Sequence, residues 1–470
     1  FLWRRCFSFQ LSGHVFIFSV KNWCPSSLEV YRTKRHCVMK IPFIIPKDTL
    51  NRLFLWHKPN LSQLFLIQKR TVALWLFYLG IIIVFFTSLR PWFLWPIQRY
   101  YMPMAFLPIV ASMLLSLRLK APLFTRKDYF FPLITMTLFL LVMALSSGRN
   151  INGIFMVFFS MAVYLSIFKV NIPELHKLSD ILATIMACIL SVSIPFFILY
   201  LICFPLPHSR TGLGDYMFDN YLFFLIDDRF NWDIIPRFHS VFIEPAHLGM
   251  ACVTLLYAQA GKWNTWRCRI LFLALFMSFS LAAYVCMVAM LFSVSWMKGK
   301  AVIGKILLLG SIILTIGVGS MFYNKGDNLI SNLIVSRLML DEEGEMEGNN
   351  RTSDLFTKEY DKMISSGEVF FGKGNEELAK FGFGNSGYRV FIYCYGIVSV
   401  FCLCVMFFAV TRTSTNKRAC ISMLLIHALS FWAHGIPYGP YIYIPLYILL
   451  FSTVCPPTHS MNCIENESNQ

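Results

Sequence analysis

The stretch RFHSVFIEPAHLG, residues 237–249, brings ionisable side chains next to a long apolar run. Its guanidinium, carboxylate and second imidazole belong to Arg237, Glu244 and His247. An arginine forms bidentate contacts with phosphate oxygens, and an imidazole or a partly desolvated carboxylate can accept a proton near neutral pH. The stretch could therefore bind a phosphate and activate a hydroxyl. The alternative is an ordinary helix end, with Glu244 as its cap and Arg237 at a membrane surface.

Proline at position 245 indicates where a helix begins. Proline is favoured at the first helical position because its missing N–H would have no helical partner there. The pattern therefore predicts Glu244 as the cap of a helix that runs to about residue 260, with His247 in its first turn. Residues three apart share a helix face, so these two side chains should be neighbours. Ionisable groups are costly in such an apolar segment, which favours a functional role.

Three further residues could join this chemistry. Arg337 and Arg351 are candidate phosphate ligands, the alternative being solvated loop arginines. His434 ends an apolar run and is the next choice for a general base, the alternative being a histidine that interacts with a helix dipole. The neighbouring pair Asp227 and Asp228 could offer carboxylates to a metal, the alternative being a solvated loop. Because the two residues are adjacent rather than spaced, we favour the loop and predict no metal site.

The composition indicates a polytopic membrane protein. Of the 470 residues, 57% are hydrophobic and only 14% are charged, whereas soluble proteins average roughly 25% charged residues. A helix needs about 20 apolar residues to cross a bilayer. We expect an all-α fold with about 11–12 transmembrane helices, from apolar runs near 71–89, 101–117, 129–146, 151–168, 181–204, 241–260, 270–297, 302–322, 387–409, 419–433 and 439–455.

Lys and Arg residues set the expected orientation, because they concentrate in cytoplasmic loops. The short loops 118–128, 169–180, 261–269 and 410–418 are richer in these residues than the alternate loops. Both termini are therefore expected in the cytoplasm, and the long loops 205–240 and 323–386 outside. The net charge of +16 follows the same pattern and is concentrated in residues 1–70, so we expect no nucleic-acid partner.

The run at 270–297 lies between two basic loops. A single crossing would place the lysines that follow it on the outside. At ~1.5 Å per residue the run is too short for two full crossings and somewhat long for one. We therefore predict a short helical hairpin that turns near Ser278–Ser280.

The chain divides into four expected regions. Residues 1–38 show no helical or strand period, contain no Met, and are expected to be untranslated or disordered. Residues 39–70 form a basic cytoplasmic segment, 71–455 the transmembrane domain, and 456–470 a cytoplasmic tail. The 14 cysteines lie mostly inside apolar runs and show no metal-type pair or disulfide framework.

Several of these stretches resemble the O-antigen polymerase family, also called oligosaccharide repeat unit polymerases, within the group that includes O-antigen ligases. RFHSVFIEPAHLG resembles the family's Arg, small residue, Phe, Glu-Pro segment, and SFSLAAY occupies the place of its following short helix. GNNRTSDLF and VFFGKGNEEL are similar to its Arg-containing and Phe-Gly-x-Gly stretches, and GYRVFIYCYGIVSV to its Tyr-Gly-Ile helix. The likeness covers roughly residues 70–455 and rests on short motifs.

The resemblance implies glycan transfer at the outer leaflet of a bacterial inner membrane. Polyprenyl-diphosphate-linked repeat units would be donor and acceptor, without a nucleotide cofactor or a metal. It also implies a flippase and a chain-length regulator as partners. Arg237, Arg337 and Arg351 would bind the diphosphate, and Glu244, His247 or His434 would be catalytic. An O-antigen ligase and a lipid-linked glycan flippase or other transporter remain the alternatives, although no internal repeat indicates a transporter.

Overall fold

The computed structural model describes four short strands within residues 7–37 and most of the apolar chain that follows. The continuous described ranges are 61–117, 172–202, 204–213, 216–227, 236–260, 262–297, 352–381, 387–412 and 417–434. Scattered positions within 134–142, 159–170 and 304–323 complete them. The predicted runs at 439–455 and the tail at 456–470 lie outside the described residues.

The chain separates into two compact units, residues 1–64 and 65–470. In the first unit, strand β1 (Phe7–Leu11) pairs antiparallel with β2 (His14–Phe18). Strand β3 (Arg32–Thr33) pairs with β4 (His36–Cys37). The sequence showed no helical or strand period here, and that residues 1–38 are untranslated or disordered stays a prediction.

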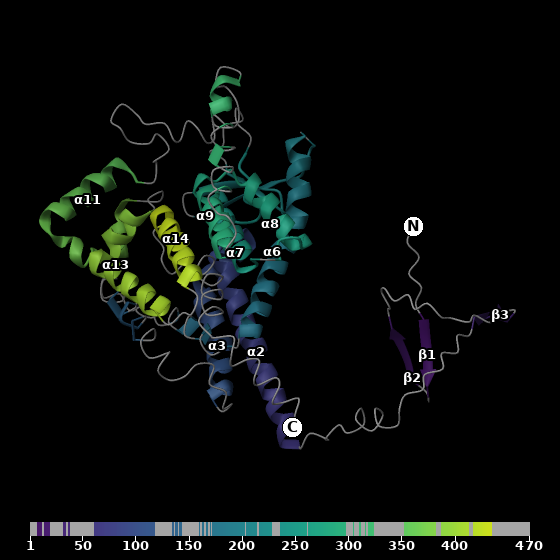
Figure 1. The fold of residues 1–470 in the computed structure, drawn as a ribbon. Coiled ribbons are helices and arrows are strands. Elements are labelled where there is room, and N and C mark those ends of the chain that lie inside the picture. The colour runs from purple at the N-terminus through teal and green to yellow at the C-terminus, as the bar shows by residue number, and fades with distance from the viewer. Residues whose placement is uncertain are drawn as a thin grey trace. The chain divides into compact units, whose positions relative to one another are not determined.

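The second unit is mostly helical (Figure 1). Three of its described helices are long and apolar enough to cross a membrane, over Lys69–Ser88, Pro173–Leu201 and Tyr388–Val405. The principal helices are α2 (Leu61–Ser88), η1 (Trp92–Tyr100), α3 (Tyr101–Leu117), α6 (Ile172–Leu201), α7 (Pro245–Ala258), α8 (Trp266–Met277), α9 (Leu281–Met297), α11 (Asp354–Ser366), α13 (Tyr388–Arg412) and α14 (Lys417–His434). The short segments η5 (Glu368–Phe370), α12 (Asn375–Leu378) and η6 (Ala379–Phe381) join α11 to α13.

Helix α7 lies at the centre of this unit. It packs against α6, α8 and α9, and every residue from Leu248 to Ala258 is buried. A helix that is apolar on all sides is stable only when neighbours cover every face. Gly249 allows α7 to lie close to α9, because a Cβ there would lie 2.5 Å from the Ala283 Cβ and 3.2 Å from the Ser278 Oγ. The start of α7 is therefore held firmly against α9.

The predicted break in the run 270–297 is present. Helix α8 ends at Met277 and α9 begins at Leu281, with Ser278 and Ser280 buried between them. Ser278 bonds back to the Leu275 carbonyl at 2.7 Å. The break places the start of α9 next to α7 rather than extending α8.

The loop at 205–240 contains β-structure, which corrects the all-α prediction. Strands β5 (Ser209–Leu213), β6 (Tyr216–Asn220) and β7 (Leu225–Asp227) form an antiparallel sheet in sequence order. Phe218 and Leu225 are buried with Ile243, and Trp95 of η1 packs against Phe218 with ring centroids 5.6 Å apart. The sheet thus contacts both η1 and the segment that precedes α7.

Helix α13 is not continuous, although the sequence predicted one run at 387–409. Gly396 has φ 76° and ψ 169°, which interrupts the helix. The loop after η5 fills the interruption: Lys373 N–H donates to the Tyr393 carbonyl at 2.7 Å and Gly374 N–H to the Cys394 carbonyl at 3.1 Å. The short helices of the predicted loop 323–386 are thereby attached to α13.

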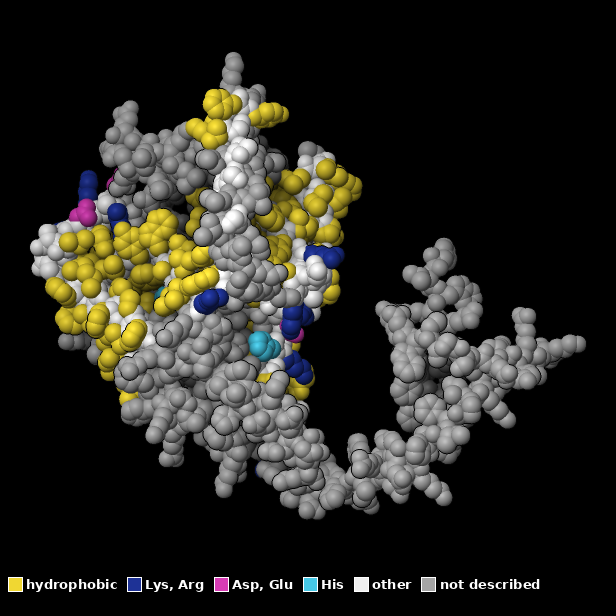
Figure 2. Space-filling view, viewed as in Figure 1, with side chains coloured by type: hydrophobic (Ala, Val, Ile, Leu, Met, Phe, Trp, Pro, Cys, Tyr) yellow, Lys and Arg dark blue, Asp and Glu magenta, His cyan; other side chains and the backbone are white. Residues whose placement is uncertain are grey.

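Large apolar side chains remain exposed on the outside of the second unit. Figure 2 shows them covering the face over α11 and α13, with few charged side chains among them. Soluble proteins seldom expose such wide apolar surfaces. The exposed apolar face therefore agrees with the three helices of membrane-spanning length.

Candidate functional site

The loop that precedes α7 is fixed by backbone hydrogen bonds to three different elements. These bonds tie it to the end of α8, to β7 and to the residue that begins η1: Phe238 N–H to Met277 carbonyl at 3.1 Å, Leu225 N–H to Ser240 carbonyl at 2.9 Å, and Trp92 N–H to Val241 carbonyl at 3.0 Å. Ser240 has φ 55°, in the left-handed region where few non-glycine residues lie. The side chains on this loop are thus presented by a well-anchored backbone.

Glu244 is the N-cap of α7 and Pro245 its first residue, as the sequence predicted. The Glu244 side chain makes no capping hydrogen bond. Its side chain is 44% exposed. The carboxylate is therefore not occupied in capping the helix and is accessible to a ligand.

His247 lies on the same face of α7 as Glu244, which confirms the predicted juxtaposition. Its Nε2 is 3.6 Å from a Glu244 carboxylate oxygen, and its side chain is only 14% exposed. At this distance the two groups would form an ion pair only when His247 is protonated, and the separation is too long for a hydrogen bond. Arg90, which follows α2, is close enough for its charge to act on His247. The start of α7 therefore combines a carboxylate, an imidazole and a nearby guanidinium.

His239 is a buried neighbour of these groups. Its Nδ1 donates to the Phe242 carbonyl. Burial lowers the pKa of His239 to about 4, although that hydrogen bond and the charges of Asp227 and Glu244 oppose the shift. The imidazole is therefore neutral at pH 7, and its bond to Phe242 shapes the turn before α7.

Arg237 belongs to the same neighbourhood. Its charge acts on His239 together with that of Glu244. It also acts on the phenol of Tyr284 in α9, whose hydroxyl donates to the Phe276 carbonyl at 2.5 Å. The guanidinium is partly buried, with its Nε inside the protein. Arg237 is thus positioned by the packing of the loop against α8 and α9.

Of the six predicted site residues, Glu244 and His247 are direct neighbours, and the charges of Arg237 and Glu244 both act on His239. Arg337 and Arg351 lie outside the described residues. His434 is the last residue of α14, which packs against α9, and its side chain lies outside the described part of the chain.

Sequence reasoning missed Arg90 and Tyr284. Arg90 is the cation that immediately follows the first long apolar helix, and that position could have indicated a role at the same membrane surface as Glu244. Tyr284 lies in SFSLAAY, and the resemblance of this stretch to a short family helix assigns no role to a particular side chain. Asp227, expected in a solvated loop, lies in β7 and acts on buried His239.

The arrangement suits transfer at a phosphorylated centre. Among the described residues, no group of three or more His, Cys, Asp and Glu side chains could hold a metal ion. The cations Arg90 and Arg237 could stabilise the negative charge of a leaving phosphate, since fixed cationic donors favour such a charge in a water-poor site. Glu244 and His247 could accept a proton from a hydroxyl. Comparison with protein-family models, with curated proteins and with solved structures finds no match for this chain.

Proposed function

We propose that this protein polymerises polyprenyl-diphosphate-linked oligosaccharide repeat units into a surface polysaccharide. It would act as a multi-pass glycosyltransferase at the outer leaflet of a bacterial inner membrane. The start of α7 carries the proposal, because an exposed Glu244 carboxylate unused for capping lies 3.6 Å from the largely buried His247. A cap with only a structural role would instead use its carboxylate to accept hydrogen bonds from the first turn.

The proposed reaction needs no cofactor. A hydroxyl of the newer lipid-linked unit attacks the anomeric carbon of the older glycan and forms the new C–O bond. The bond between that carbon and the diphosphate oxygen breaks, and polyprenyl diphosphate leaves with the bonding electrons. The hydroxyl proton passes to Glu244 or His247, with His434 as the next candidate. Arg237, aided by Arg90 and by Arg337 or Arg351, stabilises the charge on the leaving diphosphate.

Two further contacts support the proposal. The stretches VFFGKGNEEL and GYRVFIYCYGIVSV, both part of the resemblance, contact each other through Lys373–Tyr393 and Gly374–Cys394. The break within SFSLAAY, at Ser278–Ser280, is followed by Tyr284, whose phenol is within reach of the Arg237 charge. In the proposed topology the chain crosses the membrane about 11–12 times, with both termini in the cytoplasm. A flippase and a chain-length regulator would be its partners.

The length distribution of the surface glycan tests the proposal. A strain that lacks the gene would be complemented with wild type, Arg237→Gln, Glu244→Gln or the control Arg210→Gln. Arg210 is an ion-paired arginine on β5 whose side chain is 75% exposed. We expect Arg237→Gln and Glu244→Gln to collapse the ladder to one repeat unit at normal protein levels, while Arg210→Gln preserves it.

Other outcomes would reject the proposal. Complete loss of surface glycan in the deletion strain would indicate a ligase or a flippase. A full ladder in both site variants would return residues 237–249 to the role of an ordinary helix end. A second assay would distinguish the roles of Glu244 and His247. Purified Glu244→Gln and His247→Gln variants would be supplied with two lipid-linked units, and the transfer rate measured against pH. Replacing the general base should remove the pH dependence of that rate.

A further inference from the structure

The end of α7 opposite Glu244 meets α6 and α8, and α6 in turn contacts α2. The 14 residues of α7 separate the two ends by about 20 Å. Arg70 of α2 lies 3.5 Å from the Glu174 carboxylate of α6, and the Tyr78 hydroxyl donates to the Glu174 carbonyl at 3.0 Å. Lys177 of α6 lies over the Trp75 ring of α2 at 5.9 Å. These contacts place several helix starts at one end of the bundle.

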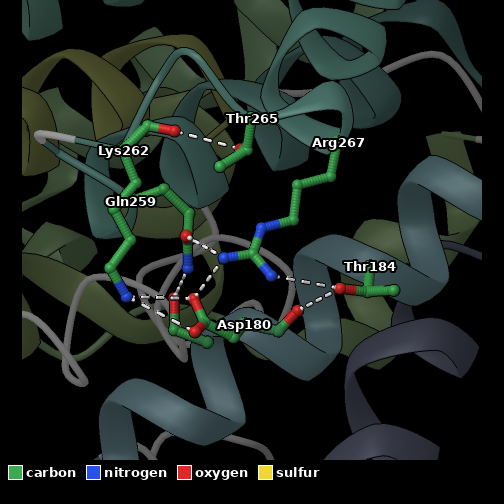
Figure 3. Close-up of polar contacts among 7 residues, drawn as sticks. Asp180, Thr184, Gln259, Lys262, Thr265 and Arg267 are labelled. Carbon is green, nitrogen blue, oxygen red and sulfur yellow. Dashed lines mark hydrogen bonds and ion pairs between the residues drawn. The ribbon is translucent and has the colours of Figure 1, made fainter. Parts of the chain in front are cut away.

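Asp180 of α6 is the centre of a polar cluster at this end (Figure 3). Arg267 of α8 lies 2.8 Å from its carboxylate, and Lys262 lies 3.4 Å from it. The Gln259 amide accepts from Arg267 at 3.2 Å and donates to the Ser179 hydroxyl at 2.8 Å. The largely buried Arg267 therefore neutralises Asp180, and the charge of Lys262 remains in excess.

Cations outnumber acids across this end. The described residues here carry two carboxylates, Glu174 and Asp180, against six cations, which we call the basic belt: Lys69, Arg70, Lys177, Lys262, Arg267 and Arg269. Lys177 and Arg269 are exposed and make no ion pair within the described part of the chain. Figure 2 shows Lys and Arg side chains gathered around a histidine over α2, α6 and α8.

An apolar stripe begins directly beside the basic belt. On α2 the side chains of Val72, Trp75 and Leu79 are 48%, 58% and 49% exposed and share one face by their spacing. On α8, Trp266, Leu273 and Phe276 repeat the arrangement at 54%, 44% and 52%. Tryptophan at the boundary between cationic and apolar surface is typical of the level of lipid headgroups.

We propose that the basic belt binds the headgroups of anionic phospholipids, whose acyl chains lie along the two apolar stripes. Basic residues next to a membrane attract anionic lipids, each contributing to the binding free energy. The surplus of four cations matches a negatively charged headgroup surface, and the adjoining stripes supply the apolar contact that a soluble anion cannot use. The inference concerns the end of the bundle remote from Glu244 and does not depend on the proposed function.

Native mass spectrometry of the full chain in detergent tests the proposal directly. Phosphatidylglycerol and phosphatidylcholine would be titrated against wild type and against the double variant Lys177→Gln, Arg269→Gln. These two residues lie outside the Asp180 cluster, so the fold should persist. A matched control is Lys358→Gln, Lys362→Gln, which removes two exposed cations from α11.

We expect wild type to prefer phosphatidylglycerol, and the double variant to lose roughly 30-fold in affinity for it without a change for phosphatidylcholine. The control variant should match wild type. A variant that conserves charge, Lys177→Arg with Arg269→Lys, should keep the preference for phosphatidylglycerol. It distinguishes an effect of lost charge from an effect of disturbed folding. Equal affinity of wild type for both lipids, or an unchanged double variant, would overturn the proposal. Displacement of phosphatidylglycerol by inorganic phosphate alone would overturn it too, since it would show a site for soluble anions.

Discussion

Lys373 and Tyr393 contact each other both through a backbone hydrogen bond and through a cation–π contact of their side chains. The backbone N–H of Lys373 donates to the Tyr393 carbonyl at 2.7 Å, and the Lys373 ammonium lies 6.0 Å from the centre of the Tyr393 ring. In a continuous helix that carbonyl would accept from the N–H four residues later, beyond Gly396. The break in α13 therefore exposes a carbonyl that the loop must satisfy, and the loop and the helix stabilise each other.

Replacing Gly396 by alanine should separate the loop from α13. An added Cβ would collide with the Phe370 carbonyl, and φ 76° is unfavourable for any side chain. Gly372→Ala should act similarly, because its Cβ would lie 2.6 Å from the Cys394 carbonyl. We expect each to lower the free energy of unfolding by more than ~2 kcal/mol, measured as a reduced melting temperature in detergent.

Gly367→Ala is the matched control for these two substitutions. Gly367 has φ 77°, but nothing lies within 4 Å of an added Cβ. Only the backbone strain remains, about 1–2 kcal/mol. A loss at Gly367 as large as that at Gly396 would show that the collision between loop and helix is unimportant.

The same loop should respond to pH at both extremes. Lys373 lies 2.8 Å from Glu359 and 3.0 Å from Glu368. The hydrogen bond to Lys373 lowers the pKa of Glu359 below 4.5, and its counterpart raises the pKa of Lys373 above 10.5. The attachment of the loop to α13 should therefore weaken as pH falls below 4.5, where Glu359 of the unfolded chain binds a proton. It should also weaken as pH rises above 10.5, where Lys373 of the unfolded chain loses a proton. Hydrogen–deuterium exchange of residues 354–381, corrected for intrinsic rates, should become faster at both ends of the pH range. In Lys373→Met this dependence on pH should be lost.

His239 predicts a separate dependence on pH near the candidate site. Because burial lowers its pKa to about 4 from 6.5, the unfolded chain binds a proton at His239 between these values while the folded chain does not. Stability should therefore fall as pH decreases from 6.5 towards 4, by up to about 3 kcal/mol. His239→Asn keeps a donor for the Phe242 carbonyl and cannot titrate, so its melting temperature should vary less over this range. An equally steep dependence in that variant would assign the effect to other groups.

Gly249→Ala should disturb the site without altering any of its side chains. The added methyl group would lie 2.5 Å from the Ala283 Cβ, and overpacking of a tight core costs roughly 1–3 kcal/mol. The start of α7 would move away from α9, so we expect the surface glycan ladder to shorten at normal protein levels. Gly310→Ala is the control, because nothing lies within 4 Å of its added Cβ and alanine favours a helix by up to about 1 kcal/mol.

The sequence was most informative where a single residue type decides the backbone. Pro245 correctly predicted the start of α7 and Glu244 as its cap, and spacing then placed His247 beside the carboxylate. The basic loops on both sides of the run 270–297, together with its length, predicted its division, which the structure places at Ser278–Ser280. The first prediction rests on local backbone geometry, and the second on nearby charges and length, so neither depends on distant residues.

The features that were missed depend on contacts between distant segments. Glycine is tolerated in a helix, so Gly396 alone did not indicate a break that a loop residue must fill. The sheet after α6 had a local signal, the Gly-Asp pair at 214–215 between two strand-like stretches, which the expectation of an all-α fold led us to overlook. Arg90 is 157 residues before His247 in the sequence, and only the folded chain shows that its charge acts there.

Because Gly249 and Ala283 pack against each other, a substitution at one position is tolerated only with a compensating change at the other. Together they enclose room for one methyl group, which position 283 supplies in this chain. Exchanging the pair, with alanine at 249 and glycine at 283, should restore much of what Gly249→Ala alone removes. Homologues that keep this helix crossing are therefore expected to vary at the two positions in a compensating manner, with a large residue at neither.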